Sequence, residues 1–352
     1  MTVSNPIREN TSISFLSNVC RRIFAAYARR CTTAIGAMAA AVFWAMLVAP
    51  PADADGKTTV CVLVPHFKDE YWLSVGYGLE QEASQHDIAL LFFEAGGYQS
   101  LAEQIAQLDD CAKRGVDAIL LGAVSSDHPE LLATIHAISG KLPVFGLVNE
   151  LLSNDLSGRI GVDWQEMGLV LGSYLAEIHP AGTAVQKAVL ISGPAESGWV
   201  GPLERGLRLG LAQSSIEILE VFRADTGLRQ QLSAVEEAFS AHPDAELLIG
   251  SAPAVEAAIG LIRATNRQTG VGLVSTYISH TIKRAVMNGR VLAVPFDDPR
   301  QQGVLAIRQM LRFLEQGQSA GFEGPEILLI NGTNNRIGSI ILSPADYFPI
   351  IQ

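Results

Sequence analysis

A stretch near the start of the chain, residues 60–72, combines a strand pattern with side chains that could hold a small ligand. Residues 60–64 are apolar and rich in valine, which is typical of a central parallel strand. Asp69, Tyr71 and Trp72 follow this strand after a short turn. Because ligands of open parallel sheets bind at the carboxyl ends of the strands, we expect these three side chains in the ligand crevice. The alternative is an ordinary loop whose rings cap the core.

Three more aromatic residues fall at the ends of predicted strands or at a predicted link between domains: Tyr98, Trp164 and Tyr277. Each ring alone is more simply explained as core or edge packing. Their repeated occurrence at strand ends that face one crevice favours a site. Trp199 follows another predicted strand and faces the same crevice by position, and we give it less weight. His66 is interpreted as a turn residue.

Apolar strands alternate with amphipathic helices along most of the chain. Strands are predicted over residues 60–64, 88–93, 116–121, 143–148, 185–191, 216–222, 247–250 and 270–276. This alternation predicts right-handed βαβ units and parallel sheets. Since the pattern restarts at residue 185, the chain holds two similar α/β blocks, and its 352 residues are long enough for two cores.

The amino end of the chain has the pattern of an export signal. Basic residues between 21 and 30 precede an apolar run over residues 34–48, and Ala52-Asp53-Ala54 supplies a cleavage pattern. We expect a signal peptide over residues 1–54, removed near Ala54, and a periplasmic location; an uncleaved anchor is the alternative. The net charge of −11 disfavours binding to nucleic acid.

The remaining reactive residues give little support to catalysis or metal binding. Cys61 and Cys111 could form a disulfide in an oxidising compartment or serve as plain core residues. The histidines lack metal-ligand spacing, so no metal site is expected. No nucleophile elbow, phosphate loop or dinucleotide turn is present in the sequence, and therefore neither a cofactor nor an enzymatic activity is expected.

Three segments carry a family resemblance. Residues 108–121, residues 159–163 with Gly168, and residues 282–303 resemble the type I periplasmic sugar-binding proteins. The resemblance implies an α/β fold, periplasmic binding protein type I, with two doubly wound parallel-sheet lobes joined by a three-segment hinge. Lobe 1 would contain residues 55–161 and 298–330, and lobe 2 residues 162–297 and 331–352. The crossovers would lie near Gly161, Asp297 and Ile330, with a helix over 305–316 and a strand over 337–341.

The departures from the sugar-binding pattern are specific. Asn149-Glu150, Trp164 and Tyr277 stand where sugar binders place residues that hydrogen-bond hydroxyl groups. With the turn at residues 65–72 and the segment 94–98, these departures resemble the TorT-type periplasmic trimethylamine N-oxide sensors. That resemblance implies trimethylamine N-oxide as ligand and a sensor histidine kinase of the TorS type as partner. It implies a pocket formed by Asp69, Tyr71, Trp72, Tyr98, Trp164 and Tyr277.

The chemistry of these side chains suits that ligand. Ring faces stabilise a methylated cation, a carboxylate adds negative potential, and Tyr hydroxyls, Trp N–H groups or backbone amides could donate to the oxide. The alternative function is the solute-binding receptor of an ABC importer for a sugar or a methylated amine. Fold and compartment do not separate this receptor from a sensor, and only the TorT-like loops do.

Overall fold

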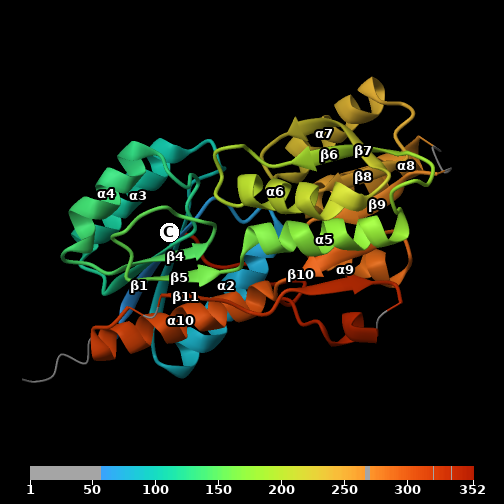
Figure 1. Cartoon of the computed structure of the whole chain (residues 1–352). Helices are drawn as coiled ribbons and strands as arrows, with labels where there is room; N and C mark the ends of the chain where they lie inside the picture. The colour runs from blue at the N-terminus through green and yellow to red at the C-terminus, as the bar shows by residue number, and fades with distance from the viewer. Residues whose placement is uncertain (1–56, 266–269, 320, 334) are drawn as a thin grey trace, which may run out of the picture. The chain divides into compact units, whose positions relative to one another are not determined.

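The computed structural model describes residues 57–352 except 266–269, 320 and 334 (Figure 1). The predicted signal peptide lies outside the described residues. Lys57–Gln352 form one unit that contains two α/β lobes. No helix of this described part is long and apolar enough to cross a membrane.

The first lobe is built on a parallel sheet with the strand order β11-β5-β4-β3-β1-β2. Its strands are β1 (Thr59–Val64), β2 (Ala89–Glu94), β3 (Ala118–Leu121), β4 (Val144–Val148), β5 (Gly158–Gly161) and β11 (Phe322–Glu323). Its helices are α2 (Glu70–Gln85), α3 (Leu101–Arg114), α4 (Pro129–Ser139) and α10 (Pro299–Gln316). The predicted strands 60–64, 88–93, 116–121 and 143–148 are confirmed by β1 to β4.

Both faces of β1 are buried, as the apolar sequence of this strand predicts. Successive side chains of a strand point to opposite faces. Val62 therefore packs in the same core as Leu79 of α2, whereas Leu63 packs in the core that contains Leu108 of α3 and Leu131 of α4. In Figure 1, α3 and α4 cover one face of the sheet and α2 and α10 the other.

The second lobe is built on a four-stranded parallel sheet, order β7-β6-β8-β9, beside an antiparallel pair of β10 and β12. Its strands are β6 (Gln186–Ser192), β7 (Ile216–Arg223), β8 (Leu247–Gly250), β9 (Gly272–Ser275), β10 (Ala293–Phe296) and β12 (Leu328–Asn331). Its helices are α5 (Trp164–Ile178), α6 (Val200–Gly210), α7 (Leu228–Ala241), α8 (Ala252–Ala264) and α9 (His280–Met287). Leucines of α5 and α6 pack on one face of β6, and α7 and α8 pack on the other.

The chain passes between the two lobes at three hinge segments, and its last residues return to the first lobe in a fourth passage. These segments lie between β5 and α5, between β10 and α10, and between β11 and β12. The first two agree with the expected crossovers near Gly161 and Asp297. Ile330, where the third crossover was expected, already lies in β12 and pairs with Val294 of β10. The third passage is therefore earlier in the chain.

Two expectations for the end of the chain were wrong. Residues 337–341, predicted as a strand, belong largely to the 3-10 helix η2 (Asn335–Ser339). Residues 331–352 were assigned to lobe 2, but Ile351 forms a parallel bridge with Phe92 and the Gln352 amide donates to the Phe92 carbonyl at 2.9 Å. β2 is the outermost strand of the first sheet, and its free edge accepts the chain end. The lobe boundaries otherwise stay a prediction.

The two cysteines of the described part form a disulfide. Cys61 of β1 is bonded to Cys111 of α3, with an S–S distance of 2.01 Å. The sequence left this pairing open, because knowing that one cysteine lies in a strand and the other in a helix does not give the distance between them. A cross-link of this kind typically stabilises a fold by about 2–4 kcal/mol.

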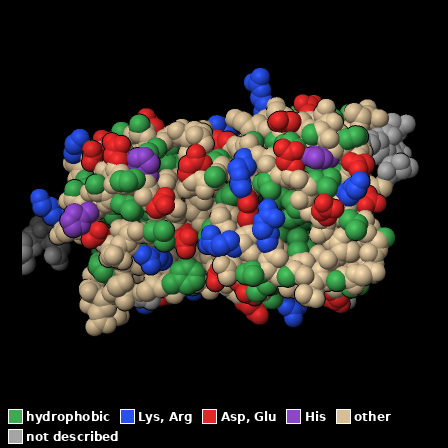
Figure 2. All heavy atoms as spheres, turned by 45° about the horizontal axis from the view of Figure 1, so that its top comes forward, with side chains coloured by type: hydrophobic (Ala, Val, Ile, Leu, Met, Phe, Trp, Pro, Cys, Tyr) green, Lys and Arg blue, Asp and Glu red, His purple; other side chains and the backbone are tan. Residues whose placement is uncertain are grey.

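The face of the molecule shown in Figure 2 carries charges of both signs. Figure 2 shows acidic and basic side chains interspersed over the view it presents, without a large basic patch. This distribution agrees with the acidic balance of the sequence.

Candidate functional site

The six residues predicted for the pocket lie around one small cavity between the two lobes. The cavity has a volume of about 20 Å³. Its lining consists of Asp69, Tyr71, Trp72, Tyr98, Val148, Asn149, Trp164, Trp199, Thr226 and Tyr277. The structure thus brings all six predicted residues together and adds Trp199, to which less weight was given. Their role in binding a ligand stays a prediction.

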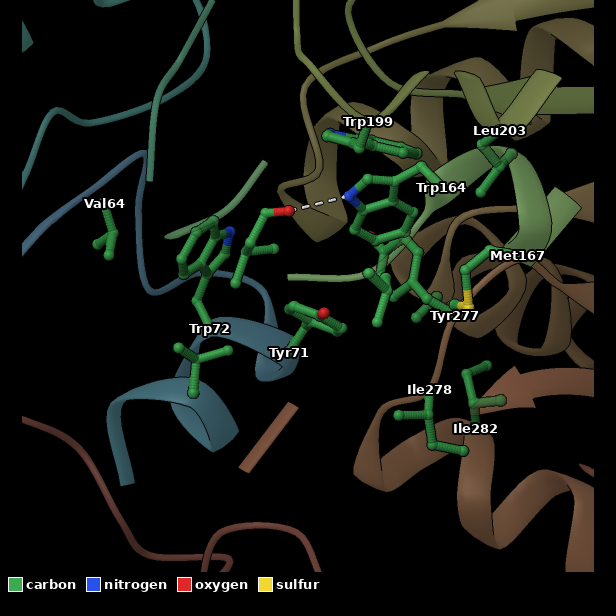
Figure 3. Packing of buried hydrophobic residues seen from close by; sticks show 14 of the residues in the cluster. Val64, Tyr71, Trp72, Trp164, Met167, Trp199, Leu203, Tyr277, Ile278 and Ile282 are labelled. Atoms are coloured by element: carbon green, nitrogen blue, oxygen red, sulfur yellow. Dashed lines mark hydrogen bonds between the residues drawn. The ribbon is translucent and has the colours of Figure 1, made fainter. Parts of the chain in front are cut away.

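Aromatic rings form most of the cavity wall, and they touch one another across the two lobes. Tyr71 of the first lobe stands edge to face with Tyr277 of the second, with ring centroids 5.5 Å apart. The ring centroid of Trp199 lies 5.8 Å from the ring centroids of both Trp164 and Tyr277. Figure 3 shows Trp72 and Tyr71 on the first-lobe side and Trp164, Trp199 and Tyr277 on the second-lobe side.

The start of α2 positions three of the first-lobe residues. Asp69 is the N-cap, and its Oδ1 accepts the Tyr71 backbone amide at 3.0 Å. A capping aspartate fixes the first helical turn, so Tyr71 and Trp72 project from that turn into the cavity wall. All three residues line the cavity, where their place after β1 led us to expect them.

The other oxygen of Asp69 links the two lobes. Oδ2 accepts a hydrogen bond from the Tyr277 hydroxyl at 2.6 Å. Burial raises the pKa of Asp69, although the hydrogen bonds from Tyr277 and from the Tyr71 amide act in the opposite direction. A cation in the cavity would favour the charged form of this carboxyl group.

A second buried carboxyl group, which sequence analysis did not include in the site, holds Tyr71 from behind. The Tyr71 hydroxyl donates to Asp297 Oδ2 at 2.6 Å, and Gln302 Nε2 donates to the Tyr71 hydroxyl at 2.9 Å. Burial raises the pKa of Asp297 to about 6. Asp297 lies at the second hinge segment, 226 residues from Tyr71, and no local pattern could have joined them.

The Trp164 indole is anchored to the end of β4. Its Nε1–H donates to the Val148 carbonyl at 3.1 Å, the dashed line in Figure 3. Val148 has a φ of +66°, and the Asn149 amide donates to the Leu147 carbonyl at 2.8 Å across it. This geometry is a γ-turn with positive φ, which is rare and strained for a β-branched residue. The turn aims the Val148 carbonyl at the indole.

The Tyr98 hydroxyl accepts hydrogen bonds on its oxygen, but its O–H group does not donate to a described residue. Asn149 Nδ2 donates to this oxygen at 3.3 Å and also to the Ala123 carbonyl at 2.8 Å. Burial raises the pKa of Tyr98, while the Asn149 and Trp72 side chains, both within hydrogen-bonding reach of the oxygen, act to lower it. Among the described residues, none accepts the hydrogen of Tyr98. This O–H group is a donor available to a ligand.

Gly122, which follows β3, leaves room for the Trp72 ring. A Cβ at this position would lie 2.4 Å from the Trp72 Cη2 atom. Any larger residue would therefore push the indole toward the centre of the cavity. The glycine sets how deeply this ring can sit.

A polar cluster joins the lobes beside Tyr98. The fully buried His66 contacts Asp225 Oδ1 and Thr226 Oγ1, both through Nε2 at 3.2 Å. Burial would raise the pKa of Asp225, but His66 and the amides of Thr226 and Tyr98 outweigh burial and lower it. A Cβ on Gly97 would lie 2.3 Å from Asp225 Oδ2, so a larger residue there would have to displace the Asp225 carboxylate, which belongs to the other lobe. His66 is thus a contact between lobes and does not line the cavity.

Comparison with known proteins shows to which family this chain belongs. Residues 60–319 match the periplasmic binding protein domain family. The chain belongs to the periplasmic binding protein family. It is 34% identical over 303 residues to the periplasmic protein TorT of Escherichia coli strain K12, which covers 85% of this chain and 86% of that protein. The fold and the periplasmic location predicted from the sequence are confirmed, as is the resemblance to TorT-type members of the family.

Solved structures of members of this family are similar to the structure of this chain. The TorS sensor domain–TorT complex in the presence of TMAO matches with a TM-score of 0.73 and 33% identity, covering 84% of this chain and 99% of the matched chain. An ABC transporter solute binding protein from Bradyrhizobium sp. BTAi1 with bound bis-tris matches with a TM-score of 0.69 and 35% identity, covering 85% and 90%. Sugar-binding members below 20% identity share the fold.

Proposed function

We propose that this periplasmic binding protein holds trimethylamine N-oxide in the cavity between its lobes and presents the bound state to the sensor domain of a histidine kinase. The relatives that support this function are TorT itself and its complexes with the TorS sensor domain, one of them in the presence of TMAO. The observation that carries the proposal is the cavity wall, in which six aromatic side chains and one carboxyl group surround a small space.

The wall suits the methylated end of the ligand. The positive nitrogen lies under three methyl groups, and each ring face would stabilise it by roughly 0.5–2 kcal/mol when water is excluded. Asp69 adds negative charge at one side. Because the free volume is only about 20 Å³, a compact ligand would require a small outward movement of the lobes and a sugar a much larger one.

The oxide of the ligand needs a hydrogen-bond donor. The hydroxyls of Tyr71 and Tyr277 already donate to carboxylates, and the Trp164 indole donates to a backbone carbonyl. The Tyr98 hydroxyl has its hydrogen available. We assign Tyr98 as the donor to the oxide, with the indole N–H of Trp199 in the same wall as the alternative donor. Donation from Tyr98 places the oxide toward Asn149 and the methyl groups toward the tryptophans and Asp69.

A second candidate function is the solute receptor of an ATP-driven importer. It is favoured by the 35% identity to an ABC transporter solute binding protein. Both functions use ligand binding without chemical conversion, and we propose that the chain is not an enzyme. The two functions differ in partner: a sensor binds a kinase domain, and an importer receptor binds a permease.

Calorimetric titration of cage variants tests the ligand site. Trp72→Ala and Trp164→Ala each remove a ring face and apolar contact, and they should weaken N-oxide binding by about 1–3 kcal/mol, or roughly tenfold to a hundredfold. Phe348→Ala is the matched control, because this ring is exposed and lies outside the cavity. If both tryptophan variants fold and bind the N-oxide as the wild type does, the cage assignment is wrong.

A further inference from the structure

A second cavity adjoins the ligand cavity at Trp164. Its volume is about 280 Å³, and Val148, Asn149 and Trp164 line both cavities. We call it the back cavity. Its remaining walls come from the turn after β4, from β5 and β11, and from the first turns of α5 and α6. Trp164 is therefore shared by a ligand space and a surface space.

The walls of the back cavity belong to both lobes. Leu152, Arg159 and Phe322 come from the first lobe, whereas Asp163 and Pro202 lie at the second-lobe end of the first hinge segment and on α6. A change in the angle between the lobes would alter the distance between these walls. The back cavity consequently has this shape only when the lobes are held as they are in this structure, with Trp164 bonded to Val148.

The mouth of the back cavity exposes apolar side chains. Leu152 is 56% exposed and Phe322 is 58% exposed, although both are large hydrophobic residues. The polar residues Glu150, Arg159 and Asp163 surround them. An apolar opening with a polar rim is typical of a protein interaction site that receives one anchoring side chain.

We propose that the back cavity is the docking point for the histidine-kinase sensor domain, which inserts an apolar side chain behind Trp164. This inference rests on the proposed function, and the choice of occupant rests on the complexes of related chains with a sensor domain in both the absence and the presence of ligand. A partner that binds both lobe arrangements equally could not sense the ligand. Docking at a cavity with walls from both lobes meets this requirement directly.

The strained turn at Val148 supplies a physical link between the two cavities. A ligand that presses on the cavity side of Trp164 acts on the Trp164–Val148 hydrogen bond, whose acceptor is the carbonyl of the strained residue Val148. Strain of this kind persists only where surrounding contacts hold it. Ligand binding would hold the turn, and with it the floor of the back cavity, in one conformation.

The test uses surface variants that leave the ligand cavity untouched. Leu152→Asp and Phe322→Asp place a charge at the mouth of the back cavity. Val185→Asp and Leu209→Asp are matched controls, since these side chains are equally exposed (56% and 58%) and lie outside it. For each purified protein, calorimetry measures affinity for trimethylamine N-oxide, and biolayer interferometry measures affinity for the TorS sensor domain with the N-oxide at saturation.

We expect Leu152→Asp and Phe322→Asp to weaken sensor-domain binding at least tenfold while N-oxide affinity stays within twofold of the wild type, and both controls to behave as the wild type. Unchanged sensor-domain binding in both variants would overturn the docking site while leaving the proposed function intact. A parallel loss of N-oxide affinity would show that the back cavity governs lobe closure and is not a docking point. A wild-type protein that binds the N-oxide but no sensor domain would contradict the sensor function itself.

Discussion

The hydroxyl of Tyr98 provides the sharpest test of how the oxide is held. Tyr98→Phe keeps the ring and removes only the O–H group that we assign as donor. Two ligands separate this contribution from the rest of the site. Trimethylamine N-oxide carries an oxygen on its nitrogen, whereas tetramethylammonium carries a fourth methyl group there and retains the positive charge.

The expected magnitude follows from the environment of the hydroxyl. A buried hydrogen bond to a charged acceptor contributes about 1.5–3 kcal/mol, so Tyr98→Phe should weaken N-oxide binding roughly tenfold to 150-fold. Tetramethylammonium makes no such bond, and its affinity should change less than threefold. Asn149 keeps its second hydrogen bond, to the Ala123 carbonyl at 2.8 Å, so the amide remains in place in the variant.

The assay is calorimetric titration of both proteins with both ligands, with circular dichroism to establish that the variant is folded. The difference between the two ligands cancels general effects of the substitution on the cavity. An equal loss for both ligands would mean that the hydroxyl supports the cage and does not contact the oxide. No loss for either ligand would assign the oxide to another donor.

Three further perturbations give distinct expected results. Asp69→Asn should weaken tetramethylammonium binding about tenfold, because the variant lacks the negative charge. In the wild type, calorimetry should show the affinity falling as the pH decreases through the raised pKa of Asp69, and the variant should not show this fall. A pH dependence that persists in the variant would refute the assignment. The pKa of Asp297 is about 6 in the folded protein against an ordinary value of 3.8, so the folded state favours the protonated carboxyl group. This contribution to the free energy of unfolding is present below about pH 4 and is lost as the pH rises through 6, a change of about 3 kcal/mol. Urea unfolding should therefore show a smaller fall in stability between pH 4 and pH 7 for Asp297→Asn than for the wild type, and identical falls would contradict this reasoning. Gly97→Ala places a Cβ against Asp225 and should hold the lobes apart, so its radius of gyration with saturating N-oxide should exceed that of the wild type by solution scattering; equal radii would show that this contact does not limit closure.

The fold was predictable because its elements are encoded locally. Residues 60–64 of β1 are apolar because both faces of the strand are covered, and the capping Asp69 follows after a short turn, so the first-lobe wall could be placed from the sequence. Parallel strands bring their carboxyl ends to one edge, and this rule collected Tyr98 with that wall; Tyr277 follows a strand of the second sheet, and the two-lobe fold implied by the family resemblance brought it to the same crevice.

The features that sequence analysis missed depend on contacts between distant segments. Nothing in a valine indicates a positive φ, and the strained Val148 is in contact with Trp164 of the other lobe through a hydrogen bond. The link of Tyr71 to Asp297 likewise joins residues far apart in the chain. The wrong strand at residues 337–341 has a similar origin, since β12 takes the place beside β10 and leaves that apolar segment to form a 3-10 turn.

The measurement that tests the central claim most directly is titration of the wild-type protein with trimethylamine N-oxide, choline and ribose side by side under one set of conditions. A cage of rings with one carboxylate and one hydroxyl donor should bind the N-oxide at least a hundredfold more tightly than ribose, because the hydroxyl groups of a sugar would remain unpaired against aromatic walls. Choline, which has the methylated cation but no oxide, should fall between them. Ribose binding as tight as that of the N-oxide would contradict the account and favour a receptor for sugar import.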